Sequence, residues 1–439
     1  MSLKKNALAT VALTGIAVAV SSAYAAGFQL TEQSSLGLGR AFAGAGIVGD
    51  DLSAVHYNVA GMTLLPGTQI QAGSVFIDVD APLKNTAGQQ IENGRLVGQA
   101  IPAGYITHQI NDQWWVGLGM TVPYGLGTEY GQNWVGAEKG NQSMVMTIDI
   151  NPSVAYKVSD KLSIGAGVSL QYAKAELGQS KINNQLSPQM PKGNIQDVVV
   201  KGDSWHCGFN LGLMYQPTET LRFGLSYRSQ IGHNAEGDAK ATVHNSLIPI
   251  PGLPQDGYTI MNSNDFKVRV TTPDTIMAAA TWEATPDLRL SGLIRWARWS
   301  NLDQLDIHAL DKDSTNHYEW KDTWLFTVGA DYRLNNEWTV RGGIAYETGA
   351  VDKAELRTAT IPDVDRIWFT AGATYHYSKQ IQIDFGAAWL KGCGNMDLYH
   401  DVFDPDSKTG YIGADAGQKF ASFDRLDAYI LGAQVQYRF

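Results

Sequence analysis

Few residues of this chain have the type and spacing that catalysis or metal binding requires. The nine histidines are scattered, and no Gly-x-Ser-x-Gly motif occurs. No Asp–His pair and no run of His, Cys, Asp or Glu has the spacing of a catalytic or metal site. We therefore expect no enzyme activity, no cofactor and no bound metal. The chemistry that remains is noncovalent binding, and the residues that perform it must be found through the elements that position them.

Two further motifs carry little functional weight. Residues 44–49 match the pattern G-x-G-x-x-G, but no strand precedes them and no βαβ unit surrounds them. We interpret the match as chance in a glycine-rich run. Cys207 and Cys393 fall on predicted strands that are not neighbours. A disulfide is conceivable in an oxidising compartment, but two unpaired, inert thiols are the favoured interpretation.

A short polar turn followed by an alternating strand recurs six times. The turns are residues 111–113, 159–161, 218–220, 285–287, 335–337 and 378–380. The spacing between successive turns suits two strands plus a loop rather than one hairpin strand. Tight turns on one side that alternate with long loops on the other are typical of an up-and-down outer-membrane β-barrel.

The strands after these turns have a two-residue period. Apolar Leu162, Ile164, Ala166, Val168, Leu170 and Tyr172 alternate with Ser163, Gly165, Gly167, Ser169 and Gln171. Successive strand side chains point to opposite faces, so each strand has one apolar and one polar surface. A soluble sandwich would give the same pattern with its apolar face inward.

The amino terminus favours the membrane alternative. Lys4 and Lys5 precede an apolar stretch at residues 7–20, and Ala23-Tyr24-Ala25 is a small-x-small cleavage site. This pattern indicates a secretory signal peptide at residues 1–25. A membrane anchor helix is the weaker interpretation, because the apolar run is short of the roughly 20 residues that a span needs.

The carboxyl terminus and the aromatic residues agree. Residues 429–439 alternate apolar and polar, and the last residue given is Phe439. Such a strand is similar to the signal that the bacterial outer-membrane assembly machinery reads. Tyr and Trp concentrate at predicted strand ends, where barrels carry interfacial girdles. We therefore expect an all-β transmembrane barrel in the outer membrane of a Gram-negative bacterium, crossing it many times.

Six tight turns imply fourteen antiparallel strands. The predicted spans are 68–80, 100–110, 113–124, 143–158, 161–177, 200–216, 219–233, 264–283, 287–301, 317–334, 337–348, 364–377, 381–394 and 425–439. The barrel therefore occupies residues 68–439, and the longest outer loops are expected near 178–199, 234–263 and 395–424. The net charge of −10 argues against nucleic acid as a partner.

A fourteen-stranded barrel needs a plug or it leaks, because larger barrels enclose aqueous channels. Residues 26–67 precede the first strand and are rich in glycine. They also carry Phe28, Leu30, Leu36, Leu38, Phe42, Ile47, Val48, Val55 and Met62. This stretch is too apolar for a free linker, so we expect it to fold into the lumen as a hatch.

These residues resemble a known family. Ala26-Gly27-Phe28-Gln29-Leu30, residues 37–42 and Asp50-Asp51 are similar to the start of long-chain fatty acid outer-membrane transporters, a family that includes channels for toluene and related aromatic hydrocarbons. The similarity continues through residues 124–129, 227–229, 320–322 and 361–366. It covers essentially the whole mature chain and is weakest in the loops.

The resemblance implies passive transport of hydrophobic molecules through a fourteen-stranded barrel with an amino-terminal hatch. Cargo would land on an apolar patch between outer loops and enter a pocket beside the mature amino terminus, where Phe28 lies. It would leave sideways, through a gap made by a kink in the third strand. Pro123, Tyr124 and Gly125 are the expected kink. Proline lacks a ladder donor, so pairing should fail there; the alternative is a strand that ends at Pro123 with a glycine loop beyond.

The resemblance also implies a partner for a carboxylate head group. Lys321 occupies the position of a family lysine, although a plain loop-edge lysine is the alternative. The family's arginine just past the fifth strand corresponds to Gln179 here, and Lys174 or Lys181 could replace it. This departure leaves room for a neutral ligand, so uptake of monoaromatic hydrocarbons such as toluene is the alternative to fatty acid transport.

Two loop segments complete the resemblance. The family's Asn-Pro-Ala in the hatch appears here as Asn58-Val59-Ala60. Loss of proline frees φ and restores an N–H, but Asn58 can still cap or bridge backbone groups, so the hatch should persist. Residues 248–254, Ile-Pro-Ile-Pro-Gly-Leu-Pro, are either the capturing patch or a spacer. The expected partners are the hydrophobic molecule, membrane lipid and the barrel assembly machinery, with the protein a monomer; a general porin is the less favoured alternative.

Overall fold

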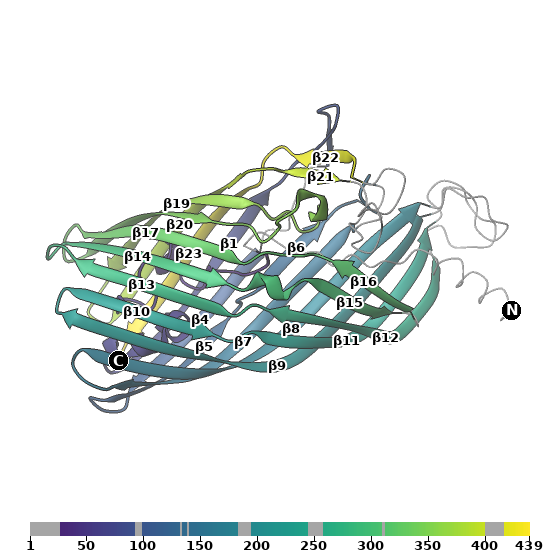
Figure 1. The fold of residues 1–439 in the computed structure, drawn as a ribbon. Helices are drawn as coiled ribbons and strands as arrows, with labels where there is room; N and C mark the ends of the chain where they lie inside the picture. The colour runs from purple at the N-terminus through teal and green to yellow at the C-terminus, as the bar shows by residue number, and fades with distance from the viewer. Residues whose placement is uncertain are drawn as a thin grey trace, which may run out of the picture.

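The computed structural model describes residues 27–92, 99–131, 134–137, 140–182, 195–244, 258–309, 312–399 and 417–439. The predicted signal peptide and residues 248–254 lie outside this part of the chain. The main sheet closes into a barrel (Figure 1). Closure comes from β1 (Thr68–Asp80), which pairs with β4 (Gln99–Gln109) on one side and with β23 (Asp427–Arg438) on the other.

The barrel wall has fourteen antiparallel strand positions, so the predicted fold class is confirmed. Nine positions are single strands: β1, β4, β7 (Gln142–Lys157), β8 (Leu162–Ile182), β9 (Ile195–Thr218), β18 (Trp338–Glu347), β19 (Asp365–His376), β20 (Ile381–Cys393) and β23. Five positions are interrupted: β5 (Trp114–Thr121) with β6 (Gly125–Glu129), β10 (Leu221–Arg228) with β11 (Ile231–His244), β12 (Tyr258–Thr272) with β13 (Thr275–Glu283), β14 (Leu288–Ala297) with β15 (Gln304–Ala309), and β16 (Lys312–His317) with β17 (Thr323–Arg333).

The six predicted turns all connect neighbouring strands of the wall. Their first residues hold them closed. Asn111 Oδ1 accepts hydrogen bonds from the N–H groups of Gln113 (2.9 Å) and Trp114 (3.0 Å). Asn335 accepts the equivalent pair two and three residues on, at 2.8 Å each. Such local side-chain acceptors favour turns over continued strand. The turns gather at the end of the barrel that also carries the C-terminus (Figure 1).

Side-chain orientation distinguishes the barrel from a sandwich. On β8, the apolar Ile164, Val168 and Leu170 are exposed, whereas Ser169 and Gln171 are buried. On β23, Leu431 is 65% exposed while Gln434 and Gln436 are buried. The apolar face therefore points outward and the polar face points into the lumen, as a lipid environment requires. Aromatic pairs such as Trp114–Tyr156, with ring centroids 4.6 Å apart, lie near the strand ends.

Toward the end of the barrel opposite the turns, the inward face becomes apolar and the outward face becomes polar. On β8 and β9 the inversion follows the outward-facing ring pair Tyr172–Trp205, whose centroids are 5.3 Å apart. Past it, the inward residues become apolar (Leu177, Val198, Val200, Ala239, Ala241, Phe266 and Val268) and the outward residues become charged (Lys174, Lys201, Asp203, Glu236 and Lys240). We call this part of β8, β9, β11 and β12 the outer extension; Figure 1 shows these strands reaching beyond the rest of the wall.

The outer extension corrects the predicted loops. Residues 178–199 and 234–263 were expected as loops, but β8 continues to Ile182, β9 starts at Ile195, β11 continues to His244 and β12 starts at Tyr258. Pairing persists because these strands bury an apolar inner face above the ring pair. The region 395–424 contains β21 (Asp397–Tyr399) and β22 (Lys419–Phe423), which form a small sheet with β2 (Leu83–Asn85) and β3 (Gln90–Glu92).

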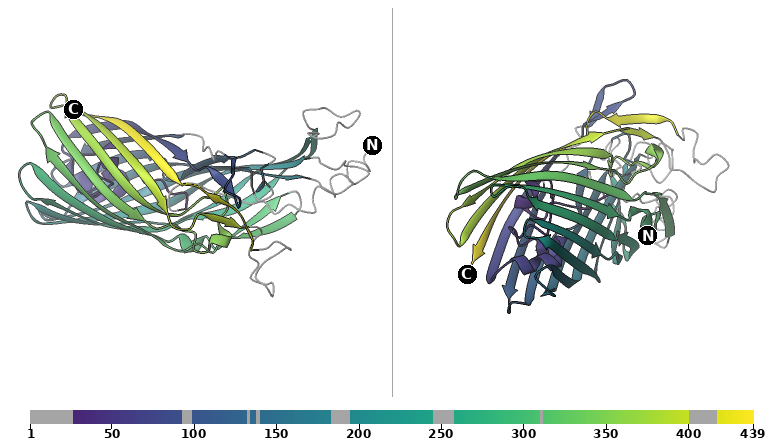
Figure 2. Two further views of the ribbon diagram at one scale, coloured as in Figure 1. Left: turned by 90° about the horizontal axis from the view of Figure 1, so that it is seen from above. Right: turned by 60° about the vertical axis from the view of Figure 1, so that its left-hand side comes forward.

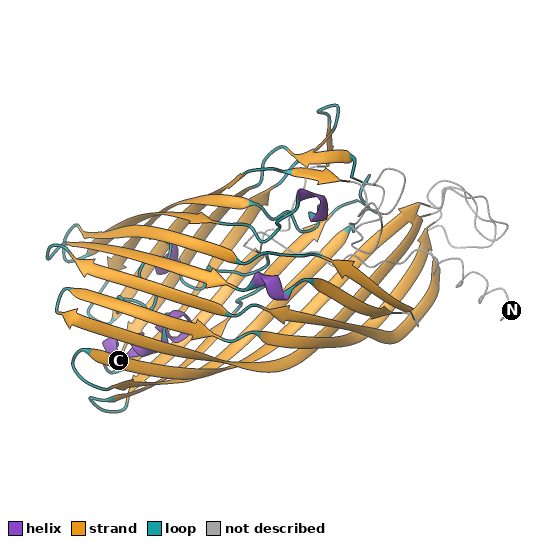
Figure 3. Ribbon diagram, in the orientation of Figure 1, coloured by secondary structure: helices purple, strands orange, loops and turns teal. Residues whose placement is uncertain are grey.

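Residues 27–67, here called the amino-terminal segment, lie inside the barrel. The segment contains α2 (Ser35–Leu38), α3 (Ala54–Tyr57) and the 3₁₀ helix η1 (Val59–Leu64), which Figure 3 shows within the wall near the turn end. All nine apolar residues singled out from its sequence are buried. The glycines of the G-x-G-x-x-G match serve its turns, since Gly44, Gly46 and Gly49 have φ of 69°, 78° and 86°.

Two short 3₁₀ helices lie outside the amino-terminal segment: η2 (Trp299–Asn301), between β14 and β15, and η3 (Ala354–Leu356), between β18 and β19. Within the described residues, no helix has the length and apolar character to cross a membrane. The thiols of Cys207 and Cys393 are both free, as the sequence favoured. The left view in Figure 2 shows the C-terminus at one end of the barrel and the strands of the outer extension reaching toward the other end.

Candidate functional site

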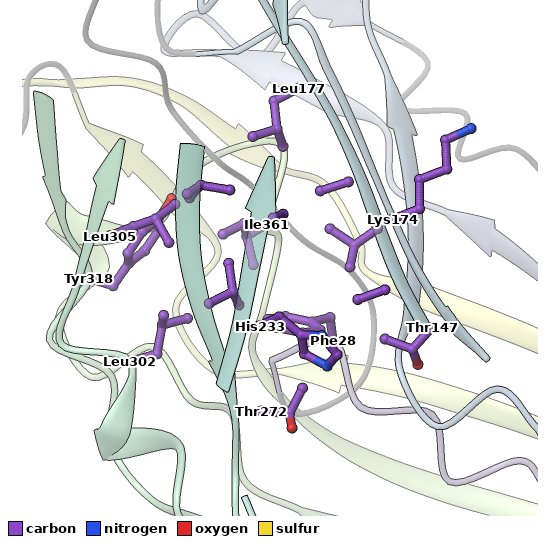
Figure 4. Close-up of a pocket in the computed structure, with 16 residues that line it drawn as sticks. Phe28, Thr147, Lys174, Leu177, His233, Thr272, Leu302, Leu305, Tyr318 and Ile361 are labelled. Atoms are coloured by element: carbon purple, nitrogen blue, oxygen red, sulfur yellow. The ribbon is translucent and has the colours of Figure 1, made fainter. Parts of the chain in front are cut away.

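An apolar pocket lies at the base of the outer extension, against the first residues of the amino-terminal segment. Its wall consists of strand and loop residues: Phe28, Val145, Thr147, Ala173, Lys174, Ala175, Leu177, His233, Ala235, Val268, Val270, Thr272, Leu302, Leu305, Tyr318 and Ile361. Figure 4 shows Phe28 and His233 at its centre, with Leu302, Leu305 and Tyr318 on one side and Thr147 on the other. Phe28 therefore lines the pocket at the place where the sequence put it.

Phe28 lines this pocket and is supported by a cluster of aromatic rings. Phe28 lies 4.8 Å from Trp299 and 5.8 Å from Tyr124 between ring centroids, both edge to face. Trp299 in turn contacts Trp320 at 5.1 Å. Gly27 packs so closely on Trp299 that a Cβ atom there would lie 2.6 Å from the indole ring. Edge-to-face rings add specific geometry to apolar burial, so the first residues of the segment are held firmly against the wall.

The polar groups of the pocket are already satisfied. His233 Nε2 lies 2.9 Å from Gln171 Oε1, and its Nδ1 lies 3.1 Å from Ser204 Oγ. The Thr147 hydroxyl donates to Tyr124 O and accepts from Tyr124 N–H, both at 3.0 Å. What remains for a ligand is an apolar surface. The free space is about 50 Å³, so lining side chains must move apart to admit an acyl chain or an aromatic ring.

Neither of the two candidate lysines points into this space. Lys174 borders the pocket, but Figure 4 shows its amine pointing away from Phe28 and His233. Lys321 is not a lining residue; its side chain is 44% exposed and its Nζ lies 3.4 Å from Asp352 Oδ1. Gln179 is buried and its Oε1 has no hydrogen-bond partner, and the side chain of Lys181 lies outside the described part. Of the predicted head-group residues, Lys174 thus borders the pocket with its amine turned away, and Lys321 lies outside the lining.

The third wall strand is broken where proline predicted it. Strand β5 ends at Thr121 and β6 begins at Gly125, which leaves Val122, Pro123 and Tyr124 outside the ladder. Strand β6 then resumes pairing with β7, from Gly125↔Met146 to Glu129↔Gln142. The alternative in which the strand simply ends at Pro123 is therefore wrong.

The break opens the wall on its other side. Strand β4 pairs with β5 only from Gly104 to Gln109. Residues 99–103 of β4 pair with β1, yet among the described residues they have no strand partner on the side of β6. We call this unpaired stretch between β4 and β6 the wall gap. Its outward neighbours are apolar and exposed: Phe76, Met120 and Met146 are 48%, 48% and 38% exposed.

The amino-terminal segment closes the wall gap from inside. Leu30 N–H donates to Pro123 O (2.8 Å), and Gly125 N–H donates to Phe28 O (3.0 Å). The Gln33 side chain donates to Val122 O (2.7 Å) and accepts from Val122 N–H (3.0 Å). These bonds satisfy the backbone groups that the broken ladder leaves open. One segment therefore contacts both the apolar pocket, through Phe28, and the wall gap.

Asn58 fixes the deeper part of the same segment. Its Oδ1 accepts from Ala60 N–H (3.1 Å) at the start of η1, and its Nδ2 donates to Leu213 O (3.0 Å) on β9. The wall is bare of side chains here: a Cβ atom on Gly165 or Gly212 would lie 2.9 Å from Ala60 N. Asn58 thus both caps η1 and bridges to the wall, with Val59 next to it in the chain.

Ion pairs inside the lumen join the segment to the wall. Arg40 Nη1 lies 2.7 Å from Asp50 Oδ2 and 3.3 Å from Asp331 Oδ1, and Arg341 Nε lies 2.9 Å from the same Asp331. Glu32 is buried, and its Oε2 has no hydrogen-bond partner. Burial, helped by the nearby Glu347 carboxylate, raises the pKa of Glu32 to about 7, against the opposing charges of Arg295 and Arg366. Glu32 is therefore a titratable group within the segment at neutral pH.

Sequence reasoning missed several of these residues. Gln33 covers the wall gap, Trp299 supports Phe28, and Gly165 and Gly212 accommodate Ala60. The alternating glycines in the strand faces were a usable signal, because inward glycines mark places where another backbone approaches closely. Nothing comparable in the sequence pointed to Gln33.

The sequence is similar to those of known outer-membrane proteins. The sequence model of the family described as outer membrane protein transport protein (OMPP1/FadL/TodX) matches residues 16–439. The long-chain fatty acid transport protein of Escherichia coli K12 is 30% identical over 427 residues, covering 89% of this chain and 94% of that protein.

Solved structures share the fold. A Pseudomonas aeruginosa FadL homologue superposes with a TM-score of 0.78 at 22% identity, covering 94% of this chain and 100% of its own. The Pseudomonas putida toluene transporter TodX superposes with a TM-score of 0.66 at 16% identity, covering 89% and 94%. At these identities the structures establish the barrel architecture.

Proposed function

The chain belongs to the outer membrane protein transport protein family (OMPP1/FadL/TodX), and from that membership we propose that it carries hydrophobic molecules, long-chain fatty acids foremost, into the outer membrane. It is an outer-membrane barrel of the kind whose apolar face meets lipid. The observation that carries the proposal is the wall gap between β4 and β6, covered by the same segment that lines the apolar pocket.

The proposed route follows apolar surface throughout. A hydrophobic molecule enters the outer extension, whose inner face is apolar, and reaches the pocket around Phe28. Residues 27–33 then move from the kink, and the molecule leaves through the wall gap between Phe76, Met120 and Met146. An acyl chain gains roughly 0.8 kcal/mol for each methylene removed from water, so this route runs downhill without an energy source.

Residues 27–67 act as the hatch in this proposal. They fill the turn end of the lumen and join the wall through Asn58 and Arg40, which favours a plugged transporter over a general porin. The family is described as one of transport proteins, and we infer that this chain has no catalytic activity. Cargo, membrane lipid and the assembly machinery that inserts barrels are the proposed partners of a monomer, after removal of the predicted signal peptide.

Monoaromatic hydrocarbons such as toluene are the second candidate cargo. One observation favours them: of the pocket-lining residues, Lys174 alone is cationic, and its amine points away. A buried carboxylate without a partner is costly, whereas a neutral ring needs none. The relatives include both a fatty acid transport protein and a toluene transporter.

Equilibrium binding to the purified, detergent-folded barrel tests the two cargoes. Oleate and toluene compete for the pocket, with Phe28→Ala as the variant that removes a lining ring. We expect oleate to bind more tightly, and Phe28→Ala to weaken both ligands. Tighter toluene binding would assign the hydrocarbon role, and steady ion conductance of the wild-type barrel in planar bilayers without ligand binding would assign a porin.

A further inference from the structure

A second, smaller cavity lies between the apolar pocket and the kink. It encloses about 30 Å³, and its lining includes Gln29, His56, Pro123, Tyr124, Arg228 and Arg295. Tyr124 connects the two spaces, since its ring lies 5.8 Å from Phe28 of the apolar pocket. Along the chain, Phe28 faces the apolar pocket and Gln29 faces this one. We call it the polar cavity.

The lining of the polar cavity is cationic. Arg228 and Arg295 both line it, and among the described residues no Asp or Glu does. Their carboxylate partners stand behind them: Arg228 Nη1 lies 2.8 Å from Asp149 Oδ2, and Arg295 Nη2 lies 2.8 Å from Glu347 Oε1. A guanidinium has five N–H donors. Arg295 uses one on Glu347 and one on Thr31, whereas the four Nη hydrogens of Arg228 already face Asp149, Ser169 and His56, which leaves its Nε–H.

Both arginines are held in place and shielded from water. The Arg228 side chain is 11% exposed and that of Arg295 is 5% exposed. Arg228 also donates to Ser169 Oγ (2.6 Å) and His56 O (3.1 Å), and Arg295 donates to Thr31 Oγ1 (2.7 Å). Charge-assisted hydrogen bonds to a fixed, buried guanidinium are about twice as strong as neutral ones.

An unsatisfied group also lines this cavity. Gln29 is buried, and its Oε1 has no hydrogen-bond partner. A buried polar group without a partner costs free energy, which a ligand head group could recover. Because amide oxygen and nitrogen are assigned from their partners, this side chain can donate to a carboxylate or accept from a protonated acid.

We propose that the polar cavity binds the carboxylate head group of a fatty acid, through Arg228, Arg295 and Gln29, while the acyl chain occupies the apolar pocket. This inference rests on the proposed function and deepens it, because it names a head-group chemistry and its partners. The polar lining suits a carboxylate, and the ring of Tyr124 joins this cavity to the apolar pocket that takes the acyl chain. The position beside Pro123 and Tyr124 puts the head group next to the wall gap before the tail follows.

Charge-neutral double variants test the proposal. In Arg295→Gln with Glu347→Gln, neither partner is left buried with an unpaired charge. Equilibrium binding of oleate and of its uncharged methyl ester is measured on the detergent-folded barrel. The wild type should prefer oleate, and the variant should lose about tenfold of oleate affinity and keep its affinity for the ester.

The matched control is Arg289→Gln with Glu283→Gln, an ion pair between β14 and β13 (2.8 Å) whose residues do not line the polar cavity. It should leave the oleate preference unchanged. If the first variant does not fold, Arg228→Gln with Asp149→Asn asks the same question from the opposite side. An unchanged oleate preference in the folded variant, or equal loss of both ligands, overturns the head-group site. Failure of the wild type to bind either ligand overturns the transport proposal as well.

Discussion

At the scale of single residues, several arginines form buried ion pairs in the described part of the lumen. Lys174 and Lys321 are exposed, whereas Arg40, Arg228, Arg295 and Arg341 are buried and paired with carboxylates in the lumen. A planar guanidinium can satisfy several buried acceptors at once, and an ammonium is more strongly hydrated. Arginine is therefore the side chain suited to a buried carboxylate in this lumen.

Lys321→Ala should have little effect on ligand binding. Lys321 forms an exposed ion pair with Asp352, and such pairs contribute at most about 1 kcal/mol. Oleate affinity should change by less than about fivefold, as measured by equilibrium binding. The matched control is Lys353→Ala, which removes another ion pair, with Lys353 Nζ 2.5 Å from Glu319 Oε2. A tenfold loss confined to Lys321→Ala would restore this lysine as a head-group partner.

Glu32 should make the stability of the amino-terminal segment depend on pH. Its folded pKa of about 7 lies above the ordinary value of 4.5, so the folded state binds the proton more tightly. Stability is then highest at low pH and falls as pH rises through 7. Glu32→Gln should remove this fall while Glu347, Arg295 and Arg366 remain.

Amide hydrogen exchange of residues 27–67 at about pH 5.5 and about pH 8.5, corrected for the intrinsic rates, measures this difference. The wild-type segment should lose more protection than the variant between the two conditions. Parallel losses in both proteins would remove Glu32 from the explanation.

At the scale of elements, the break between β5 and β6 is the feature that joins fold to function. Prolines and glycines predicted it because they act locally, through a missing donor and a missing side chain. The contacts that close this break cannot be predicted from local sequence. Gln33 bonds to Val122 from 89 residues away, and no local pattern encodes a contact of that separation.

The strands with the expected bounds are those whose signals come from neighbouring residues in the sequence. The six turns and the two-residue period depend on neighbours in sequence, so strands such as β1 and β20 have the expected bounds within a residue. The outer extension was missed because its apolar and polar faces exchange after Tyr172 and Trp205. A search for one continuous alternation ends at that exchange and assigns loop beyond it.

Gly125→Val should impair uptake without preventing barrel assembly. A Cβ atom at Gly125 would lie 2.7 Å from Leu30 Cδ1, so a larger side chain displaces the segment from the kink or blocks the wall gap. Fatty acid uptake by cells is the measurement, with electrophoretic mobility of the unheated barrel as the check on folding. Gly232→Ala, whose added Cβ has its nearest neighbour at 3.8 Å, is the control. Wild-type uptake by a folded Gly125→Val barrel would exclude exit at this site.

At the scale of the whole molecule, the wall and the amino-terminal segment fit together through glycine. The inward faces of β8, β9 and β10 present Gly165, Gly212 and Gly224 to residues 47 and 58–60. Backbone lies against backbone there, and Asn58 bonds to the wall carbonyl of Leu213. The seal of the lumen thus depends on the absence of side chains as much as on the apolar residues of the segment.

Gly212→Val should therefore open the lumen. A Cβ atom there would lie 2.3 Å from Asn58 Oδ1 and 2.9 Å from Ala60 N, so the segment must move away from β9. We expect ion conductance in planar bilayers where the wild type has none. Gly342→Ala, whose nearest neighbour would be 3.6 Å away, should stay closed. Absence of conductance in a folded Gly212→Val barrel would show that the lumen is sealed elsewhere.

The apolar border of the wall gap has a consequence for the direction of flow. Because Phe76, Met120 and Met146 face outward around it, the compartment that receives the cargo is hydrocarbon rather than water. Each added methylene, at roughly 0.8 kcal/mol, multiplies the equilibrium ratio of membrane to water concentration by about four. Longer chains therefore partition more strongly into the membrane, and their net flux stays inward even at low external concentrations.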